Sequence, residues 1–178
     1  MHEMFEKEWK IHFVCGTILV IRSFYALSKR KEGCKMNEKI IVYERMPFYY
    51  ETDRMGIIHH SNYIRWFEEA RIHMVEKMGY SFAKMEELGI MSPVLDVKVE
   101  YKQPTRFGET VRIETSQTFF NGVRVSFAYK VIEKENGELK AVGSSSHCFI
   151  NEKFQPISLK RSFPDLYNIY VPYTVSED

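Results

Sequence analysis

The stretch YYETDRMGIIHHSNYIRWFEEAR, residues 49–71, decides the fold, because it places a short polar loop directly before an amphipathic helix. From Tyr63 onward, apolar residues recur at three- and four-residue spacing, which predicts a helix with one buried face. We expect Ser61 to cap its start and Gly79 to end it. The positive end of such a helix, with its free backbone N–H groups, points back at the loop that contains Asp53.

The segments that flank this helix alternate apolar and polar residues, as half-buried antiparallel strands do. One strand is expected before the helix, over residues 40–49, and four after it, around residues 97–101, 111–114, 123–131 and 139–150. A short second helix is expected over residues 82–88. The Asn-Gly pairs at 121–122 and 136–137 predict tight turns, and Gly143 predicts a bulge or a close backbone approach. We therefore predict an α+β fold, with a curved antiparallel sheet of about five strands wrapped around one long central helix.

The length and composition of the chain fit one ordinary domain, and they indicate no particular binding partner. The chain has 178 residues, 44% of them hydrophobic, and a formal net charge of +1, so nothing in it favours a nucleic-acid partner. Cys15, Cys34 and Cys148 show no metal-binding spacing, and so sparse a set favours a reducing compartment, the cytoplasm. The neighbours His59 and His60 lack further ligands at suitable spacing, so we expect no metal and no cofactor.

Other catalytic systems find little support in the sequence. It contains no G-x-S-x-G elbow, no Walker A loop and no dinucleotide-binding fingerprint. His147 and Cys148 are neighbours in an expected strand, so their side chains should face opposite sides of the sheet. They are therefore not expected to form a Cys–His catalytic pair.

The loop carries a recognisable order of residues: Asp53, Gly56, two aliphatic residues, His59, His60, Asn62 and Tyr63. This order resembles the motif of the 4-hydroxybenzoyl-CoA thioesterase family, whose members are hot-dog-fold acyl-CoA thioesterases. The resemblance continues through Val97, Val99, Tyr101, Pro104 and Gly108 and covers roughly residues 38–160. One departure is His59, which stands where the family usually has an aromatic residue.

The resemblance implies an acyl-CoA thioester hydrolase that releases the free acid and CoA. Asp53 would be its catalytic carboxylate, either as a nucleophile through a mixed anhydride or as a general base on water. His60 would polarise or position the carbonyl or the water, and amides at the helix N-terminus would stabilise the oxyanion. The leaving thiol, with a pKa of roughly 8.5, needs no strong acid.

The remaining loop residues are expected at the substrate: Gly56 through a close backbone approach, Asn62 by fixing the loop, and His59 and Tyr63 as neighbours. An Asp before a helix commonly caps a turn, which is the plain alternative for Asp53. Glu69 is an alternative catalytic carboxylate, since a related branch uses a Glu on the helix. Three basic residues are candidates by type for the CoA phosphates: Lys102, Arg106 and Arg124.

Family members pair edge to edge, with active sites at the interface, so we expect a homodimer or homotetramer that binds acyl-CoA. Two alternatives stay open: a thioesterase of the same fold that acts on acyl carrier protein, and a non-catalytic acyl-CoA-binding module. We expect an N-terminal extension over residues 1–36, the thioesterase domain over 37–170 and a tail over 171–178. The extension contains an apolar stretch, Ile11–Leu27, interrupted by Arg22. It is read as a tail upstream of a start at Met36, a packing helix or a weak anchor, but not as a membrane span.

Overall fold

The computed structural model describes residues 40–173. The expectations for residues 1–36 therefore lie outside the described part. The elements follow one another as β1 (Ile41–Arg45), η1 (Tyr49–Glu51), α2 (Asn62–Lys77), α3 (Phe82–Glu87), β2 (Val94–Tyr101), β3 (Val111–Phe120), β4 (Arg124–Glu133), β5 (Leu139–Cys148), α4 (Leu159–Ser162), α5 (Pro164–Tyr170) and η2 (Val171–Tyr173).

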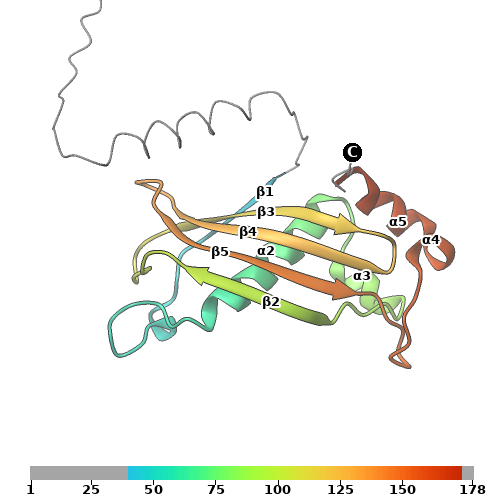
Figure 1. Cartoon of the computed structure of the whole chain (residues 1–178), viewed down its shortest axis with the longest axis horizontal. Helices are drawn as coiled ribbons and strands as arrows, with labels where there is room; N and C mark the ends of the chain where they lie inside the picture. Colours follow the sequence, from blue (N-terminus) through green and yellow to red (C-terminus); the bar gives the residue numbers. More distant parts are fainter. Residues whose placement is uncertain (1–39, 174–178) are drawn as a thin grey trace, which may run out of the picture. The chain divides into compact units, whose positions relative to one another are not determined.

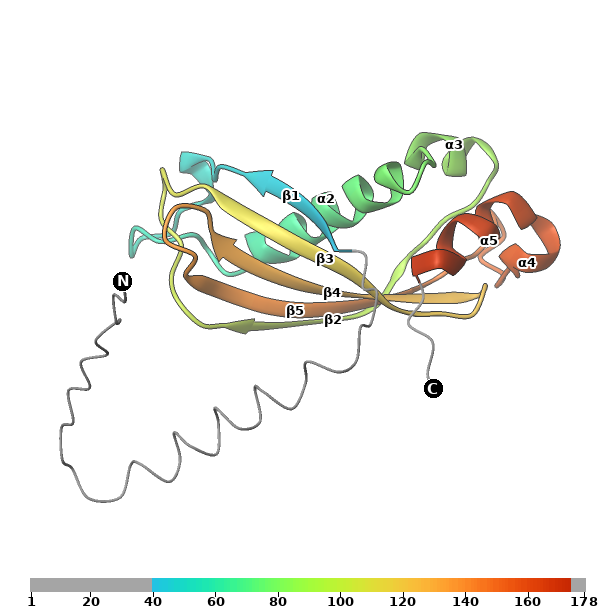
Figure 2. The ribbon, with the colours of Figure 1, turned by 90° about the horizontal axis from the view of Figure 1, so that it is seen from above.

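The five strands form one antiparallel sheet in the order β1-β3-β4-β5-β2, so β1 and β2 are its edges (Figure 1). Figure 2 shows α2 lying across one face of this curved sheet. Alternate residues of the central strand β4 are buried on the face toward the helix. On α2, the buried residues Trp66, Phe67, Ala70 and Met74 recur at the expected helical spacing. The expected α+β arrangement of five strands around one long helix is confirmed.

Gly143 of β5 lies against the side chain of Phe67 from α2. A Cβ atom added there would overlap the ring of Phe67 and lie 2.7 Å from the carbonyl oxygen of Lys98. The Phe67 ring in turn stacks on Tyr129, with the ring centroids 4.4 Å apart. The close backbone approach that the sequence predicts at Gly143 is therefore confirmed.

Both predicted Asn-Gly turns are present, with φ of 84° at Gly122 and 74° at Gly137. The first strand is shorter than predicted, since it ends at Arg45 rather than at residue 49. Pro47 follows almost at once, and proline has no N–H to donate to a strand ladder. The chain turns there into the short helix η1.

The C-terminal helices α4 and α5 are not predicted by the sequence analysis. They cover one end of the sheet (Figure 1) and bury Leu159, Leu166 and Tyr170. Tyr170 stacks on Phe120 of β3, with 5.0 Å between ring centroids. The expected tail begins as the short helix η2, and its residues 174–178 lie outside the described range. Between residues 40 and 173, no helix combines the length and the apolar character that crossing a membrane requires.

Candidate active site

A cavity of about 410 Å³ opens between the loop before α2 and the chain just after β2. Its walls come from both segments: Asp53, Met55, Ile57, Ile58, His60, Tyr63, Tyr101, Lys102, Gln103 and Pro104. This volume lies in the range of small-molecule sites. The cavity brings three of the predicted site residues together, namely Asp53, His60 and Tyr63.

Asp53 begins a tight turn and also faces the cavity. Its N–H donates to the carbonyl oxygen of Ile57 at 2.8 Å, and its Oδ1 accepts the N–H of Met55 at 2.7 Å. Asp53 therefore does cap a turn, as the alternative interpretation of this residue predicts. Its other carboxylate oxygen, Oδ2, accepts no hydrogen bond from any described residue, so one oxygen remains available for chemistry.

Gly56 completes this turn with φ of 73°, a conformation that glycine adopts without strain. A close approach is not the reason for the glycine, because no atom lies within 4 Å of the place where its Cβ would be. Gly56 does not line the cavity. Its contribution is to shape the turn that carries Asp53.

His60 and Tyr63 are held by residues from other parts of the chain. The Tyr101 hydroxyl donates to the backbone carbonyl of His60 at 3.0 Å, and its ring meets the exposed His60 imidazole edge to face. The buried Tyr63 hydroxyl donates to Thr105 Oγ1 at 2.9 Å. These contacts tie the start of α2 to the segment after β2 and define two walls of the cavity.

His59 and Asn62 do not line the cavity. Nδ1 of His59 shares a hydrogen bond with the Ser61 hydroxyl at 2.8 Å, and the Ser61 side chain makes no capping bond. The prediction that Ser61 caps the helix is therefore wrong. Its backbone already has helical angles, φ −65° and ψ −23°, whereas a capping side chain needs an extended residue.

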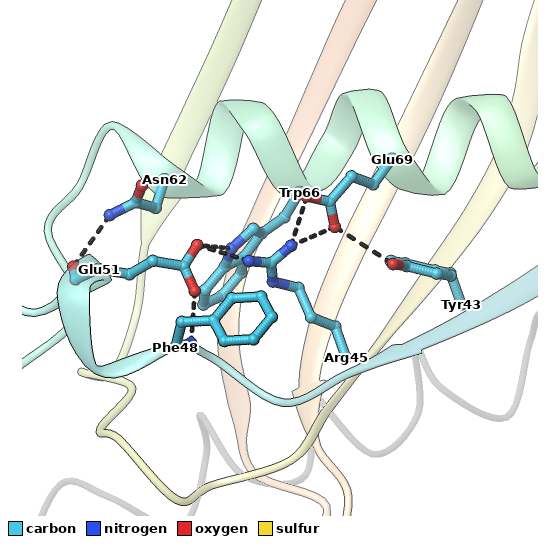
Figure 3. Close-up of polar contacts among 7 residues, drawn as sticks. All are labelled: Tyr43, Arg45, Phe48, Glu51, Asn62, Trp66 and Glu69. Carbon is cyan, nitrogen blue, oxygen red and sulfur yellow. Dashed lines mark hydrogen bonds and ion pairs between the residues drawn. The ribbon is translucent and has the colours of Figure 1, made fainter.

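Glu51 of η1 holds the start of the Asp53 loop in place, as an anchor, through its buried side chain (Figure 3). Its side chain is only 3% exposed and accepts three hydrogen bonds: from Arg45 Nη2 at 2.6 Å, Trp66 Nε1 at 2.9 Å and the Phe48 N–H at 2.6 Å. Burial alone would raise the pKa of Glu51, but these three donors and the Arg45 charge outweigh it, and the pKa is lowered. The carboxylate therefore stays ionised and fixes η1 against α2.

The backbone carbonyl of Glu51 extends the anchor to the loop itself. It accepts the His59 N–H at 2.9 Å and Nδ2 of Asn62 at 2.9 Å (Figure 3). Asn62 thus makes the loop-fixing hydrogen bond expected of it, though at a distance from the cavity wall. Asp53 lies between Glu51 and His59, within the part of the loop that these hydrogen bonds close.

Glu69, the alternative catalytic carboxylate, belongs to the same anchor. It pairs with Arg45 and accepts the Tyr43 hydroxyl at 3.2 Å, and it does not line the cavity (Figure 3). Sequence reasoning missed Arg45 and Glu51. The two residues are six positions apart, and their contact depends on the turn after Arg45 that leads into η1, which the sequence analysis predicts as a continuation of the strand.

The three basic residues considered for CoA lie in different places. Lys102 lines the cavity. Arg106 is exposed in the same connecting segment but is not part of the wall. Arg124 pairs with Cys148 on β5, whereas Tyr101 at the cavity pairs with Ala141, seven residues along that strand. At about 3.3 Å per residue this separation is roughly 23 Å, so Arg124 is remote from the cavity.

The Thioesterase-like superfamily matches residues 49–165 of the chain. Among curated relatives, YneP of Bacillus subtilis (strain 168), named as a candidate acyl-CoA thioesterase, is 37% identical over 123 residues, 68% of this chain and 88% of YneP. The acyl-CoA thioester hydrolase YbgC of Escherichia coli O157:H7 is 25% identical over 127 residues, 71% of this chain and 95% of YbgC.

A solved structure of a DHNA-CoA thioesterase from Staphylococcus aureus superposes with a TM-score of 0.72 at 39% identity, covering 75% of this chain and 89% of that one. These similarities, together with the sheet and helix described above, confirm the hot-dog fold. The matched segment includes the loop of Asp53, all the residues that line the first cavity, and Glu51, but not its partner Arg45.

Proposed function

This chain belongs to the thioesterase-like superfamily, and we propose that it hydrolyses an acyl-CoA thioester to a free acid and CoA, with Asp53 as the catalytic carboxylate. Relatives named as acyl-CoA thioester hydrolases support this enzyme class. The observation that carries the assignment of Asp53 is its placement. Its carboxylate lines the cavity at the start of α2, and only one of its two oxygens is used to hold the turn.

The start of α2 supplies the electrophilic side of the site. The N–H of Asn62 is taken by the His59 carbonyl at 3.0 Å. The N–H groups of Tyr63 and Ile64 belong to the first turn, where the helix offers no acceptor. A thioester carbonyl placed in the cavity would direct its oxygen toward these amides, which would stabilise the oxyanion as it forms. His60 on the cavity wall would orient the carbonyl or the attacking water.

Two routes satisfy this geometry. In the first, an Asp53 oxygen adds to the carbonyl carbon, the C–S bond breaks, CoA leaves as the thiolate, and water then hydrolyses the mixed anhydride. In the second, Asp53 removes a proton from water while the water oxygen adds to the carbonyl carbon, and the C–S bond then breaks. In both routes the net reaction adds one water across the C–S bond.

Lys102 at the cavity wall is the best-placed basic residue for a CoA phosphate. We also propose that two chains pair through β2. Along this edge strand Val94, Leu95, Val97 and Tyr101 are exposed, and a free edge with apolar side chains is normally covered. A cytoplasmic location stays a prediction from the cysteine content.

The test is thiol release from short, long and aromatic acyl-CoAs by the wild-type protein, Asp53→Asn and a control, Asp165→Asn. Asp165 is an exposed carboxylate on α5. We expect turnover to fall by a factor on the order of 10³ in Asp53→Asn and to be unchanged in Asp165→Asn, with folding retained in both. A single turnover in H₂¹⁸O then tests the first route. Unlabelled product acid with label in Asp53 indicates attack of water on the Asp53 carbonyl of an anhydride. Labelled acid with unlabelled Asp53 excludes that attack, and it is the result expected both from the general base and from attack of water on the acyl carbonyl of the anhydride.

Two alternatives give different results in the same assay. An acyl-carrier-protein thioesterase would release thiol faster from acylated carrier protein than from acyl-CoA. A binding module would bind acyl-CoA and release no thiol, and Asp53→Asn would leave its affinity unchanged. Either result would remove acyl-CoA hydrolysis as the function.

A further inference from the structure

A second cavity, of about 70 Å³, lies farther along α2, between this helix and the strands β2, β4 and β5. Its polar wall is formed by Arg71, Tyr129, Ser145 and His147, and its apolar side includes Ile64 and Val97. Except for Ile64 and Val97, these side chains are almost completely buried. The cavity therefore combines a small volume with an unusual concentration of buried polar groups.

Arg71 is a buried cation without an anion. Only 5% of the residue is exposed, and its guanidinium lies over the Phe82 ring, 5.2 Å from the centroid. It forms no hydrogen bond or ion pair with any residue in the range 40–173. Glu68, at the same cavity, is exposed and makes no ion pair with it. A buried charge that lacks a partner is costly, so an acceptor supplied from outside would be bound favourably.

The opposite wall is a chain of hydrogen bonds that ends at the cavity. The Tyr129 hydroxyl and Ser145 Oγ are 2.8 Å apart, and Ser145 Oγ and His147 Nε2 are also 2.8 Å apart. Nδ1 of His147 is buried and has no hydrogen-bond partner among the described residues. These groups bring no negative charge to Arg71. Two of their three protons are used in the hydrogen bonds between them, so one N–H or O–H is left to donate to a ligand.

Both cavities take residues from α2 and from β2, and no residue lines both of them. The first takes Tyr63 from the helix and Tyr101 from the strand, and the second takes Arg71 and Val94. At 1.5 Å per helical residue, Tyr63 and Arg71 are about 12 Å apart along the axis. The Arg71 guanidinium itself lies over the ring of Phe82, the first residue of α3, so it marks the end of the second cavity that is remote from the first cavity.

We propose that this second cavity binds the far end of the acyl group, and that this end is a carboxylate that pairs with Arg71. The substrate would then be the CoA thioester of a short dicarboxylic acid. This inference rests on the proposed thioesterase function. The planar guanidinium can pair with both oxygens of a carboxylate. The cavity has room for about two water-sized groups, which suits a carboxylate better than a long alkyl tail.

The test compares kcat/KM for substrates matched in length: adipoyl-CoA against hexanoyl-CoA, and suberoyl-CoA against octanoyl-CoA. The wild-type protein should prefer the carboxylate member of at least one pair by about tenfold or more. Arg71→Met should abolish this preference and change the rate with the alkyl member by no more than about twofold. Arg65→Met removes an exposed arginine from the same helix and should leave the preference unchanged.

Two further variants keep the test decisive if Arg71→Met does not fold. Arg71→Lys retains the charge but not the paired donors, and Ser145→Ala removes only a hydroxyl. Each should lower the carboxylate preference by about threefold or more. Equal preference in the wild type and all three variants would overturn the inference, while thiol release would still support the thioesterase function.

A third substrate pair, benzoyl-CoA and hydroxybenzoyl-CoA, tests whether the second cavity binds a neutral hydroxyl group instead of a carboxylate. An Arg71-dependent preference confined to this pair would assign the cavity to a hydroxyl group and overturn the carboxylate. If the wild-type protein hydrolyses no thioester of any pair, the proposed function fails, and this inference fails with it.

Discussion

Two arginines with little exposure, Arg45 on β1 and Arg71 on α2, have opposite surroundings. The Arg45 side chain is 9% exposed and pairs with Glu51 and Glu69, so its charge is balanced within the fold (Figure 3). Arg71 is 5% exposed and lies over an aromatic ring, and no carboxylate among residues 40–173 pairs with it. The comparison shows that a buried arginine can have two different roles in this protein. A paired charge fixes the loop of Asp53, and an unpaired one marks a place where a ligand completes the pairing.

The strongest test of this difference between Arg45 and Arg71 is to replace each arginine by methionine and compare the stability of the two variants. Arg45→Met leaves the buried Glu51 carboxylate without its cation, so we expect the free energy of unfolding to fall by about 3–5 kcal/mol. Arg71→Met removes an unpaired charge and one ring contact, so the change should stay within about 1 kcal/mol. Urea unfolding of both variants measures the two values. Equal losses would show that Arg71 is a structural residue like Arg45.

The second prediction concerns pH. Burial, and then the charge of Arg71, lower the pKa of His147 to about 4, although the nearby backbone of Ser92 and Pro93 and the charge of Asp96 oppose this shift. Between pH 4 and 6.5 the unfolded chain therefore binds more protons than the folded one. Stability is present above pH 6.5 and is lost as the pH falls toward 4, by up to about 3 kcal/mol.

The Glu51 pKa is lowered instead, so its contribution is lost only below its ordinary value, 4.5. Unfolding measured from pH 7 to 4.5 thus reports on the His147 cluster and not on the Arg45 anchor. His147→Gln should flatten the slope in this range. A slope that survives the substitution would point to another titrating group.

A smaller effect is expected from Asn62→Ala. The variant loses one hydrogen bond to the Glu51 carbonyl, which keeps the bond from the His59 N–H. We expect a loss of about 1 kcal/mol in unfolding free energy. Activity should fall more than stability implies, because the loop of Asp53 loses one of its two attachments. Asn168→Ala, an exposed change on α5, is the control for both measurements.

The smallest expected effect comes from an exposed ion pair, which shows how much burial adds to the stability that an ion pair contributes. Lys134 and Glu44 are 2.7 Å apart, almost as close as Arg45 and Glu51, but both are about half exposed. Lys134→Ala should cost less than about 1 kcal/mol, and 0.5 M NaCl should reduce even that. A cost comparable to that of Arg45→Met would mean that distance, rather than burial, sets the value of a pair in this protein.

The sequence predicted the features that depend on local pattern. The long helix, the two Asn-Gly turns and the close approach at Gly143 follow from spacing and residue type. Opposite burial of His147 and Cys148 also followed from strand alternation, since His147 is 1% exposed and Cys148 is partly exposed. The loop motif, through its resemblance to a family, pointed to the residues that line the first cavity.

What the sequence missed depends on how the elements pack against one another. The Arg45–Glu51 pair and the lone Arg71 look alike in sequence, as charges near an amphipathic helix. Only the packed structure shows which of them has a partner. Helices α4 and α5 were missed because they are short, with 4 and 7 residues, and are stabilised by burial against the end of the sheet.

Gly143 sets a limit on how this sequence can vary. Any other residue there would place a side-chain carbon in the space of the Phe67 ring and against the Lys98 carbonyl. The clash involves a backbone atom and a fully packed ring, so no single rotamer change relieves it. In a library in which every position is randomised and selected for folded protein, position 143 should remain glycine, whereas residues on the outer face of the same strand should vary freely.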